Sequence, residues 1–494
     1  MDLLSNVMQK AAIGDYKRRT KIVATLGPAS ESATIIGQLI DAGANVFRLN
    51  FSHGSHEEHK NKATIIRRLA EEKGKTIAIL GDLQGPKIRI AKFKSGSVHL
   101  QLDQVFILDA RLDKSAGDEK QVGIDYPDLV KDCRVDDTLL LDDGRIQLVV
   151  TEIKAQKVFT KVTVAGTLSN NKGINRLGGG LSAPALTEKD FADIAFAASL
   201  KMDYVAVSFP RCAEDILKAK KALEQAKGDA GIVAKIERAE IIQDDAVLNR
   251  LIEVSDVVMV ARGDLGVEIG DAELVSEQKK IISRARSLDK MVITATQMME
   301  SMIESAMPTR AEVFDVANAV IDGTDAVMLS AESAAGHYPV ESVAAMSRII
   351  EGAEKYPPVA RSGHRMDSHF TRIDEAIALS AMYAANHLDG VKAIVCMTET
   401  GRTPRIMSRI SSAVPIFAFA RQAETRRRLA LCRGVHAIDA DIEVNTIKAM
   451  HIWVSDQLKR HQIAQAGDLV IFANGDIQHQ QGGTNTMTIL TIAE

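Results

Sequence analysis

The sequence has few cysteines and no cysteine pairs. Four occur in 494 residues, and no two of them have the spacing typical of a zinc site or a redox motif. The chain therefore lacks the framework of a disulfide-stapled secreted protein, and we expect free thiols in a reducing compartment. The four cysteines lie far apart in the sequence: Cys133, Cys212, Cys396 and Cys432.

Long hydrophobic runs and basic clusters are also missing. No stretch stays apolar for the ~20 residues that a membrane-spanning helix requires, and the N-terminus lacks the basic and apolar regions of a secretion signal. The net charge is -4, and no window combines clustered Lys and Arg with aromatic residues. We therefore expect a cytoplasmic protein of soluble metabolism, with no membrane and no nucleic acid among its partners.

The sequence does have a repeated strand–helix rhythm. A length of 494 residues predicts several domains, because one hydrophobic core seldom organises so long a chain. Eight apolar, β-branched runs alternate with amphipathic segments, and eight parallel strands are the number that closes a (β/α)8 barrel of the TIM type. The predicted strands cover residues 21–25, 44–52, 76–82, 203–209, 231–235, 256–260, 290–297 and 325–332.

Two further regions break this α/β rhythm. Between residues 87 and 184 the helical periodicity gives way to short alternating runs with a hairpin signal at Asp142, Asp143 and Gly144, which predicts an inserted all-β domain. Its Gly/Asn-rich exit favours a hinged lid over a rigid appendage. We expect an N-terminal leader (1–19), a barrel in two parts (20–86 and 185–355), an inserted β-barrel lid (87–184) and a C-terminal α/β regulatory domain (356–494).

Polar residues follow all eight predicted barrel strands, at the end where such barrels place their chemistry. The strongest signal comes from Lys235 and Glu237 after one strand and Asp264 after the next. Carboxylate oxygens are the ligands that a hard cation such as Mg²⁺ prefers, and a lysine beside them is a fixed positive charge. This combination indicates phosphoryl transfer. The alternative is a structural Lys235–Glu237 ion pair at the end of a barrel strand.

Two other patterns carry weaker signals. Arg48, Asn50 and Ser52 project to one side of the second strand, where they either point into a site or mark an exposed edge. The apolar start and glycine-terminated end of this strand favour the site. In the C-terminal region, residues 400–403 offer hydroxyls, backbone N–H groups and a guanidinium to a phosphate, with an ordinary helix cap as the alternative.

Five long motifs are far more specific than a short glycine fingerprint. They are TKIVATLGPA (20–29), RLNFSHG (48–54), AKIER (234–238), ARGDLGVE (261–268) and ITATQMMESM (293–302). In these motifs the chain resembles the pyruvate kinases over essentially its whole length, and GDLQGPKIR (81–89) resembles their bacterial form. The resemblance implies transfer of phosphate from phosphoenolpyruvate to ADP, giving pyruvate and ATP in the last step of glycolysis.

The resemblance also implies roles for individual residues. Glu237 and Asp264 would hold Mg²⁺ (or Mn²⁺), and the Gly263 backbone with the Thr296 hydroxyl would receive the substrate carboxylate. Lys235, Arg48 and Arg89 would neutralise the phosphoryl group in flight, because charge neutralisation is the main help that a protein gives to its loose transition state. The nucleotide would contact Asn50, His53, Arg89 and Lys172. Thr296, Ser330 and Glu332 are all candidates to protonate the enolate, through water, and the sequence does not choose among them.

The chain departs from the family pattern at a monovalent-cation site. The family commonly places K⁺ among positions that match Asn50, Ser52, Asp82 and the carbonyl of Leu83. Members that need K⁺ resemble one another in having Glu where this chain has Lys87. An ammonium group there replaces the charge of the ion. We therefore predict that K⁺ is dispensable.

A second departure concerns the effector. Glu399 stands where relatives activated by a sugar bisphosphate present a non-acidic residue, and its carboxylate would repel a second phosphate. We therefore expect a sugar monophosphate or AMP as the allosteric effector and, from the family, a homotetramer. The expected effector loop comprises Thr398, Thr400, Gly401, Arg402 and Thr403.

Two rival functions are consistent with parts of this pattern. Barrel enzymes that bind pyruvate or its enolate through Mg²⁺ also perform aldol chemistry, but they need neither a lid carrying Lys172 nor a lysine at the phosphoryl group. A non-catalytic sensor of phosphometabolites is expected to have lost Lys235 or a metal carboxylate, and both remain.

Overall fold

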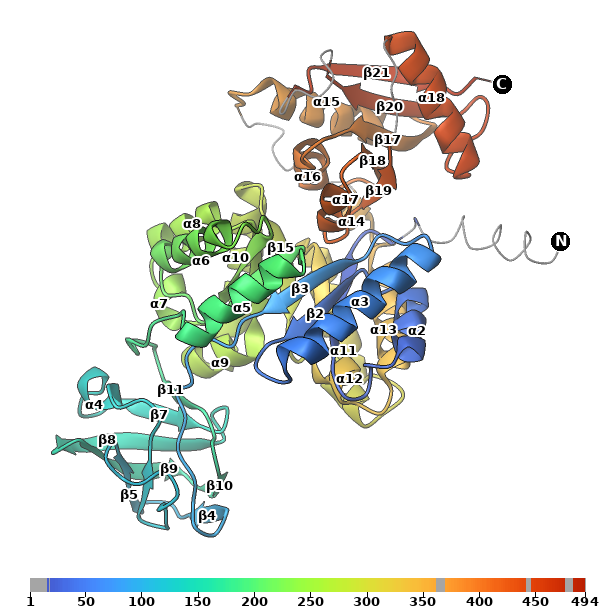
Figure 1. The fold of residues 1–494 in the computed structure, drawn as a ribbon. Coiled ribbons are helices and arrows are strands. Elements are labelled where there is room, and N and C mark those ends of the chain that lie inside the picture. Colours follow the sequence, from blue (N-terminus) through green and yellow to red (C-terminus); the bar gives the residue numbers. More distant parts are fainter. Residues whose placement is uncertain (1–15, 17, 361–368, 441–445, 476–482, 494) are drawn as a thin grey trace.

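Eight parallel strands form a closed barrel at the centre of the molecule, with a β domain at one end and an α/β domain at the other (Figure 1). The structure is a computed structural model that describes Tyr16 and residues 18–360, 369–440, 446–475 and 483–493. Most of the predicted leader (1–19) lies outside the described residues. The predicted combination of a (β/α)8 barrel, an additional β domain and a C-terminal α/β domain is confirmed.

The barrel strands follow one another in chain order except where the inserted domain separates β3 from β12. Around the barrel the order is β1-β16-β15-β14-β13-β12-β3-β2, and every pairing is parallel. The strands are β1 (Lys21–Leu26), β2 (Val46–Asn50), β3 (Ala78–Asp82), β12 (Tyr204–Val207), β13 (Gly231–Ile236), β14 (Val257–Ala261), β15 (Met291–Ala295) and β16 (Ala326–Leu329).

Amphipathic helices surround these strands, and the polar residues before several of them act as caps. Capping boxes begin at Ser55, Thr187 and Thr309. The longer barrel helices are α2 (Ala33–Ala42), α3 (His56–Glu72), α5 (Glu188–Ser199), α6 (Ala213–Gln225), α8 (Asp245–Val254), α10 (Asp271–Ser287), α11 (Arg310–Asp322) and α13 (Pro339–Ala353). The shorter ones are α7 (Ala239–Ile242), α9 (Arg262–Ile269), η1 (Glu300–Ile303), α12 (Ala331–Ala334) and α14 (Pro357–Ala360).

The inserted domain contains a six-stranded sheet in the order β11-β7-β8-β9-β5-β6 and a two-stranded sheet, β10-β4. Its own apolar core includes Phe106, Leu139 and Leu148. The predicted hairpin turn joins β7 to β8, with both aspartates at positive φ. The elements are β4 (Ser97–Leu100), β5 (Val105–Asp109), β6 (Gln121–Gly123), α4 (Leu129–Asp132), β7 (Thr138–Leu141), β8 (Ile146–Lys154), β9 (Lys157–Val164), β10 (Gly166–Ser169) and β11 (Ile174–Arg176).

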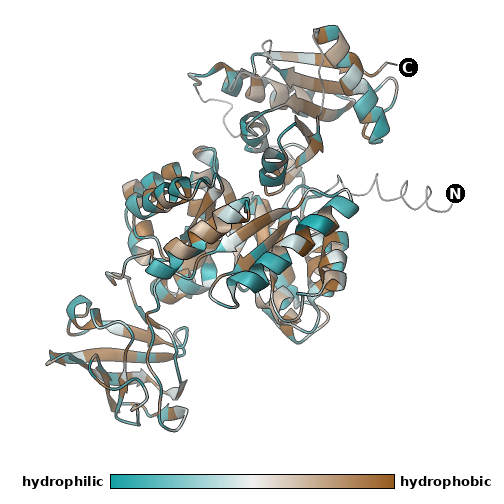
Figure 2. Cartoon of the chain, viewed as in Figure 1, coloured by the Kyte–Doolittle hydropathy of each residue, from teal (hydrophilic) through white to brown (hydrophobic). Residues whose placement is uncertain are grey.

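The C-terminal domain is a five-stranded sheet in the order β19-β18-β17-β20-β21, in which only β21 is antiparallel. Figure 2 shows that the strands here and in the barrel are mainly hydrophobic, whereas many helices carry hydrophilic residues outward. No helix among the described residues has the length and apolarity to cross a bilayer. The elements are α15 (Ile373–His387), β17 (Val391–Met397), α16 (Arg402–Ser408), β18 (Ile416–Ala420), α17 (Ala423–Leu429), β19 (Val435–Asp439), α18 (Ile447–Arg460), β20 (Leu469–Asn474) and β21 (Thr486–Thr491).

The C-terminal domain covers the amino-terminal end of the barrel strands. One cluster of buried residues runs from inside the barrel, through Tyr204 and Met291, to Cys396 and Ile406 of the C-terminal domain. The Tyr204 hydroxyl donates to the carbonyl of Arg428 at 2.6 Å, and the ammonium of Lys21 donates to that of Val435 at 2.7 Å. This end of the barrel is therefore closed, and the carboxyl end remains for chemistry.

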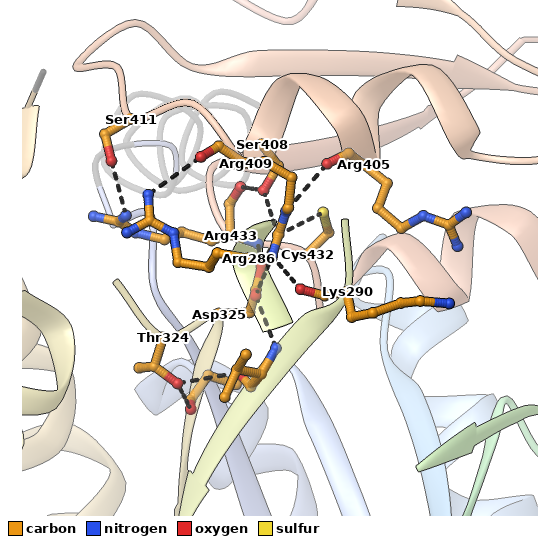
Figure 3. Close-up of polar contacts among 12 residues, drawn as sticks. Arg286, Lys290, Thr324, Asp325, Arg405, Ser408, Arg409, Ser411, Cys432 and Arg433 are labelled. Carbon is orange, nitrogen blue, oxygen red and sulfur yellow. Dashed lines mark hydrogen bonds and ion pairs between the residues drawn. The ribbon is translucent and has the colours of Figure 1, made fainter. Parts of the chain in front are cut away.

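A buried ion pair joins the two domains at this closed end (Figure 3). Arg409 and Asp325 are 1% and 0% exposed, and both carboxylate oxygens of Asp325 accept hydrogen bonds from the guanidinium. The Arg433 and Val292 amides also donate to Asp325, at 3.0 and 2.9 Å. The carboxylate of Asp325, which immediately precedes β16, thus connects the start of β15 to the C-terminal domain.

Loss of this carboxylate is expected to destabilise the protein strongly. In Asp325→Ala the guanidinium of Arg409 would stay buried without its partner, which typically costs about 3–5 kcal/mol. We expect thermal unfolding to begin at a clearly lower temperature than in the wild type. Glu72→Ala is the control, because Glu72 pairs with Arg68 on an exposed helix surface, where such pairs contribute about 0–1 kcal/mol. Equal unfolding temperatures for the two variants would contradict the prediction.

Candidate active site

Strand alternation brings four charged side chains together at the open end of the barrel. Val233, Lys235 and Glu237 lie on one face of the β13 segment, and Val233 belongs to the barrel interior. The Lys235 ammonium lies 2.8 Å from a Glu237 oxygen and 3.6 Å from an Asp82 oxygen. The other Asp82 oxygen lies 2.6 Å from the Arg48 guanidinium. Lysine and arginine thus share one carboxylate across three strands.

Other hydrogen bonds fix these groups in place. Lys235 donates to the Ser208 hydroxyl at 2.8 Å, and Arg48 donates to the Thr25 hydroxyl at 3.2 Å. One Glu237 oxygen accepts the Phe209 amide at 2.8 Å. Because each side chain has a partner on a neighbouring strand end, the cluster is organised before any ligand arrives.

Burial and charge oppose each other in this cluster. Asp82 and Glu237 are 1% and 0% exposed, so burial raises the pKa of Asp82, but the charges of Lys235 and Arg48 outweigh it and the pKa ends below its usual value. Burial likewise lowers the pKa of Lys235, but the carboxylates of Asp82 and Glu237 raise it above the ordinary lysine value. The lysine is therefore a permanent positive charge and not a proton donor at neutral pH.

Asp264 is the third carboxylate of the site and lies in the first turn of α9, directly after β14. Burial, followed by the charge of Glu237, raises the pKa of Asp264 to about 7. Among the described residues, the carboxylates of Glu237, Asp264 and Asp82 face two cations, Lys235 and Arg48. The surplus of buried negative charge fits a divalent cation held by Glu237 and Asp264.

The described residues contain no group of three or more His, Cys, Asp or Glu side chains arranged to hold a metal. A site with two carboxylates suits Mg²⁺, which usually keeps several waters or substrate oxygens as its remaining ligands. The sequence-based expectation of Glu237 and Asp264 as ligands therefore remains a proposal that the chemistry of the donors supports.

Thr296 lies opposite the amino end of α9. Its hydroxyl accepts the Gly263 amide at 2.8 Å and donates to the Ala295 carbonyl at 2.7 Å. A Cβ atom added at Gly263 would lie 3.4 Å from this hydroxyl oxygen, at van der Waals contact, so the helix and the threonine are close neighbours. The N–H groups of the first helical turn and the hydroxyl therefore face the same small space, which suits a carboxylate.

Ser330 and Glu332 lie at the next strand end, but Glu332 already has a structural role. Its two oxygens accept the Met299 amide at 3.2 Å and the Ser330 amide at 2.7 Å, and the residue is 2% exposed. The carboxylate thus connects the segments that follow β15 and β16. Of the three candidate proton donors, Thr296 lies beside the amino end of α9, whereas Glu332 is committed to backbone amides.

A cavity of about 350 Å³ lies between the inserted domain and the barrel. Ser52, Lys87 and Arg89 line it together with Lys172 and Asp264, so it brings together residues that are far apart in the sequence. Lys172 lies 2.6 Å from Asp142 of the hairpin turn. A second cavity of about 530 Å³ shares Asp264 and is lined by Gly263, Arg262 and Gln297 on one side and Asp143 and Gly144 of the insert on the other.

The remaining barrel residues predicted for the site lie around this mouth. The Asn50 side chain accepts the Ser52 amide at 3.1 Å. His53 is exposed and contributes its carbonyl to a contact with His59, and it does not line the two cavities described above. The Leu83 carbonyl accepts the Ser208 hydroxyl at 2.8 Å. Asp82 and Leu83 are thus already used by protein groups at the predicted monovalent-cation positions.

The predicted effector loop lies far from this mouth, between β17 and α16. The Thr398 hydroxyl accepts the Gly401 amide at 2.9 Å, and Thr403 is hydrogen-bonded to Thr484 at 2.8 Å. Arg402 lies 2.9 Å from Asp374 and 3.2 Å from Glu375 of α15, and Thr400 is exposed. A phosphate at this loop would have to compete with two carboxylates for Arg402.

Sequence reasoning did not assign Asp143 to the site. The sequence identified it only as part of a hairpin turn, but the insert places it in both cavities, where its charge contributes to the raised pKa of Asp264. The two adjacent aspartates could have indicated a role for Asp143 in the site, because a hairpin turn needs only one aspartate before its glycine. Across the site, two fixed cations face a buried carboxylate pair beside a helix terminus, which is an arrangement suited to phosphoryl transfer.

Comparisons with known proteins give a consistent result along the chain. The family model described as "Pyruvate kinase, barrel domain" matches residues 17–343, and "Pyruvate kinase, alpha/beta domain" matches residues 375–490. "Pyruvate kinase II" of Salmonella typhimurium is 58% identical over 96% of this chain and 99% of its own length. A pyruvate kinase of Haemophilus influenzae is 55% identical over 96% and 98%. The crystal structure of a pyruvate kinase from Cryptosporidium parvum superposes with a TM-score of 0.89, at 32% identity and 97% coverage of both chains.

Proposed function

This chain belongs to the pyruvate kinase family, and we propose that it carries out the family's reaction with the charged cluster at the open end of the barrel. That reaction transfers the phosphoryl group of phosphoenolpyruvate to ADP and gives pyruvate and ATP. The observation that carries the assignment of the site is the position of Lys235, within 2.8 and 3.6 Å of carboxylates from two strands. The test is a coupled assay for pyruvate formation that depends on ADP.

Substrate binding uses both signs of charge. The carboxylate of phosphoenolpyruvate would accept hydrogen bonds from the N–H groups at the start of α9 and from the Thr296 hydroxyl. The Gly263 amide and this hydroxyl already lie together, 2.8 Å apart. Glu237 and Asp264 would hold Mg²⁺ or Mn²⁺, which supplies positive charge to the substrate oxygens when bound. Lys235 and Arg48 then face the phosphoryl group, and their charges offset the negative charge that moves between the leaving and attacking oxygens.

The nucleotide fits the cavity between the barrel and the inserted domain. Arg89 and Lys172 line this cavity, and both bring positive charge to the side where a diphosphate would enter. Asn50 and His53 lie at the adjacent strand end. The insert therefore serves as a lid whose closure over the nucleotide excludes water from the transfer.

Protonation of the enolate at carbon completes the reaction. We assign this step to Thr296, acting through water, because Glu332 is buried and occupied by two backbone amides. Ser330, which directly follows β16, is the remaining candidate for this role. The Thr296 hydroxyl lies beside the expected carboxylate position, so a water held by it can deliver a proton to the methylene carbon of the enolate, which becomes the methyl group of pyruvate.

The ammonium group of Lys87 is proposed to replace K⁺. Lys87 is exposed and lines the cavity that also contains Ser52. In Lys87→Glu, we expect activity without K⁺ to fall at least about 10-fold and to recover on addition of K⁺. The substitution replaces a positive charge by a negative one, which a bound cation would then have to neutralise. The measurement is turnover with and without K⁺ at constant ionic strength. A large K⁺ stimulation of the wild-type protein would overturn the assignment.

Regulation and assembly are further proposals from the family. A sugar monophosphate or AMP is the proposed effector, bound at the loop of Thr398, Thr400, Gly401, Arg402 and Thr403, and a homotetramer in the cytoplasm is the proposed assembly. Two hydroxyls of this loop are already hydrogen-bonded and its arginine is paired with Asp374 and Glu375. Activity measured against each class of sugar phosphate and AMP tests the effector.

A further inference from the structure

The turn that carries Thr296 has an unusual backbone conformation. Thr296 and Gln297 both have positive φ, 67° and 54°, although neither is glycine and threonine is β-branched. Each such residue costs on the order of 1–3 kcal/mol and persists only when its surroundings impose the conformation. Both residues follow β15 directly, so the turn changes the direction of the chain at the strand end where Thr296 is needed.

The side chain of Arg262 imposes this conformation. Its guanidinium donates to the Thr296 carbonyl at 2.8 and 3.2 Å and to the Gln297 carbonyl at 3.0 Å, and the residue is 7% exposed. The far edge of the guanidinium lies 2.7 Å from Asp315 of α11. The planar group thus connects two consecutive carbonyls to a fixed carboxylate, which a lysine could not reproduce.

The backbone of Arg262 sets the other side of the same contact. Arg262 is the first residue of α9 and immediately precedes Gly263 and Asp264. One residue therefore begins the helix whose Gly263 amide meets the Thr296 hydroxyl and also holds the turn that aims this hydroxyl at the amide. Arg262 lines the second cavity, but the hydrogen bonds of its guanidinium go to protein groups, and none of them goes to Lys235, Glu237 or Asp264.

We propose that Arg262 is a positioning residue for proton delivery to the enolate, acting through the Thr296 turn. The inference rests on the proposed role of Thr296 as the group that passes the proton. When the guanidinium is lost, the two carbonyls lose their common donor and the turn relaxes toward ordinary backbone conformations. The hydroxyl then moves relative to the Gly263 amide, and displacements of about 1 Å in such groups can cost about 10²-fold in rate.

The test separates proton delivery from phosphoryl transfer. Exchange of the methyl hydrogens of pyruvate in D2O, followed by NMR, reports the proton step, and ATP formation from phosphoenolpyruvate and ADP reports phosphoryl transfer. In Arg262→Gln we expect exchange to fall about 10- to 100-fold and ATP formation to fall clearly less. Arg262→Lys should recover only part of the exchange. An equal loss of both rates in Arg262→Gln would indicate a merely structural role and overturn the proposal.

Two further variants complete the design. Arg286→Gln is the matched control, because Arg286 is also partly buried and donates to the Arg409 and Asp322 carbonyls, at 3.2 and 3.5 Å, at the opposite end of the barrel. It should leave exchange unchanged. In Thr296→Ala, adding Arg262→Gln should cause little further loss of exchange, since residues that act as a unit are not additive. Additive losses overturn the proposal for Arg262, whereas normal exchange in Thr296→Ala overturns the proposed role of Thr296.

Discussion

Replacement of Lys235 by methionine is expected to lower kcat for pyruvate formation by about 10³-fold or more. Removing a single donor from a preorganised site costs about 10²–10³-fold, and a charge placed on a phosphoryl group in flight contributes about 10³–10⁵-fold. Lys235 is held by carboxylates at 2.8 and 3.6 Å and by a hydroxyl at 2.8 Å, so its charge is fixed before the reaction begins. Methionine fills a similar volume without the charge.

The effect on kcat should exceed the effect on KM. A charge that acts on the migrating phosphoryl group stabilises the transition state more than the bound substrate, and its loss therefore appears mainly in turnover. Steady-state kinetics at saturating Mg²⁺, with both substrates varied, measure the two parameters. A variant that keeps a tenth of wild-type kcat would show that Lys235 is only a structural partner of Glu237.

Lys189→Met provides the matched control for this substitution. Lys189 is also a lysine beside a buried carboxylate, since its ammonium lies 2.6 Å from Asp193 and 2.7 Å from the Phe51 carbonyl. It belongs to α5 and does not contact the charged cluster. We expect a kcat within a few-fold of the wild type, with any loss appearing in thermal stability. A comparable loss of kcat in both variants would point to misfolding and not to catalysis.

The positions of the site residues were predictable where strand periodicity decides them. Lys235 and Glu237 share one face of β13 because successive side chains alternate, and Asn50 and Asp82 are direct neighbours in the parallel pairing of β2 and β3. The uniformly apolar run Val257–Ala261 is fully buried, as expected for a strand covered on both faces. These features depend on local pattern and on the closure of the barrel, and the sequence contains both.

Other features depend on tertiary contacts that no local pattern contains. The helix α9 begins without any loop after β14 and includes Gly263 and Gly266, which are poor helix formers. The Gly263 amide meets the hydroxyl of Thr296, 33 positions away in the sequence. The contribution of Asp143 required the docking of the inserted domain.

Substitution of Glu237 by glutamine is expected to raise the Mg²⁺ concentration for half-maximal activity by about 10²-fold or more. Mutating a group that merely supports a metal ligand typically costs 10–100-fold in affinity, and a carboxylate that ligates directly should cost more. Glutamine keeps an oxygen that can accept the Phe209 amide, so the local fold should survive. It removes one negative charge from a cluster of three carboxylates and two cations, which takes away the surplus that favours a dication.

Binding of Mn²⁺, measured directly by calorimetry, separates a loss of metal affinity from a loss of chemistry. Glu268→Gln is the control, because Glu268 is 2% exposed and accepts the Ala239 amide at 2.8 Å in the same region of the barrel mouth without facing Lys235. Glutamine there keeps an oxygen that can accept the Ala239 amide and removes no group proposed to ligate the metal, so Mn²⁺ affinity should stay within a few-fold of the wild type. Unchanged Mn²⁺ affinity in Glu237→Gln would place the metal elsewhere. The role of Glu237 would then be to hold the ammonium group of Lys235 in position.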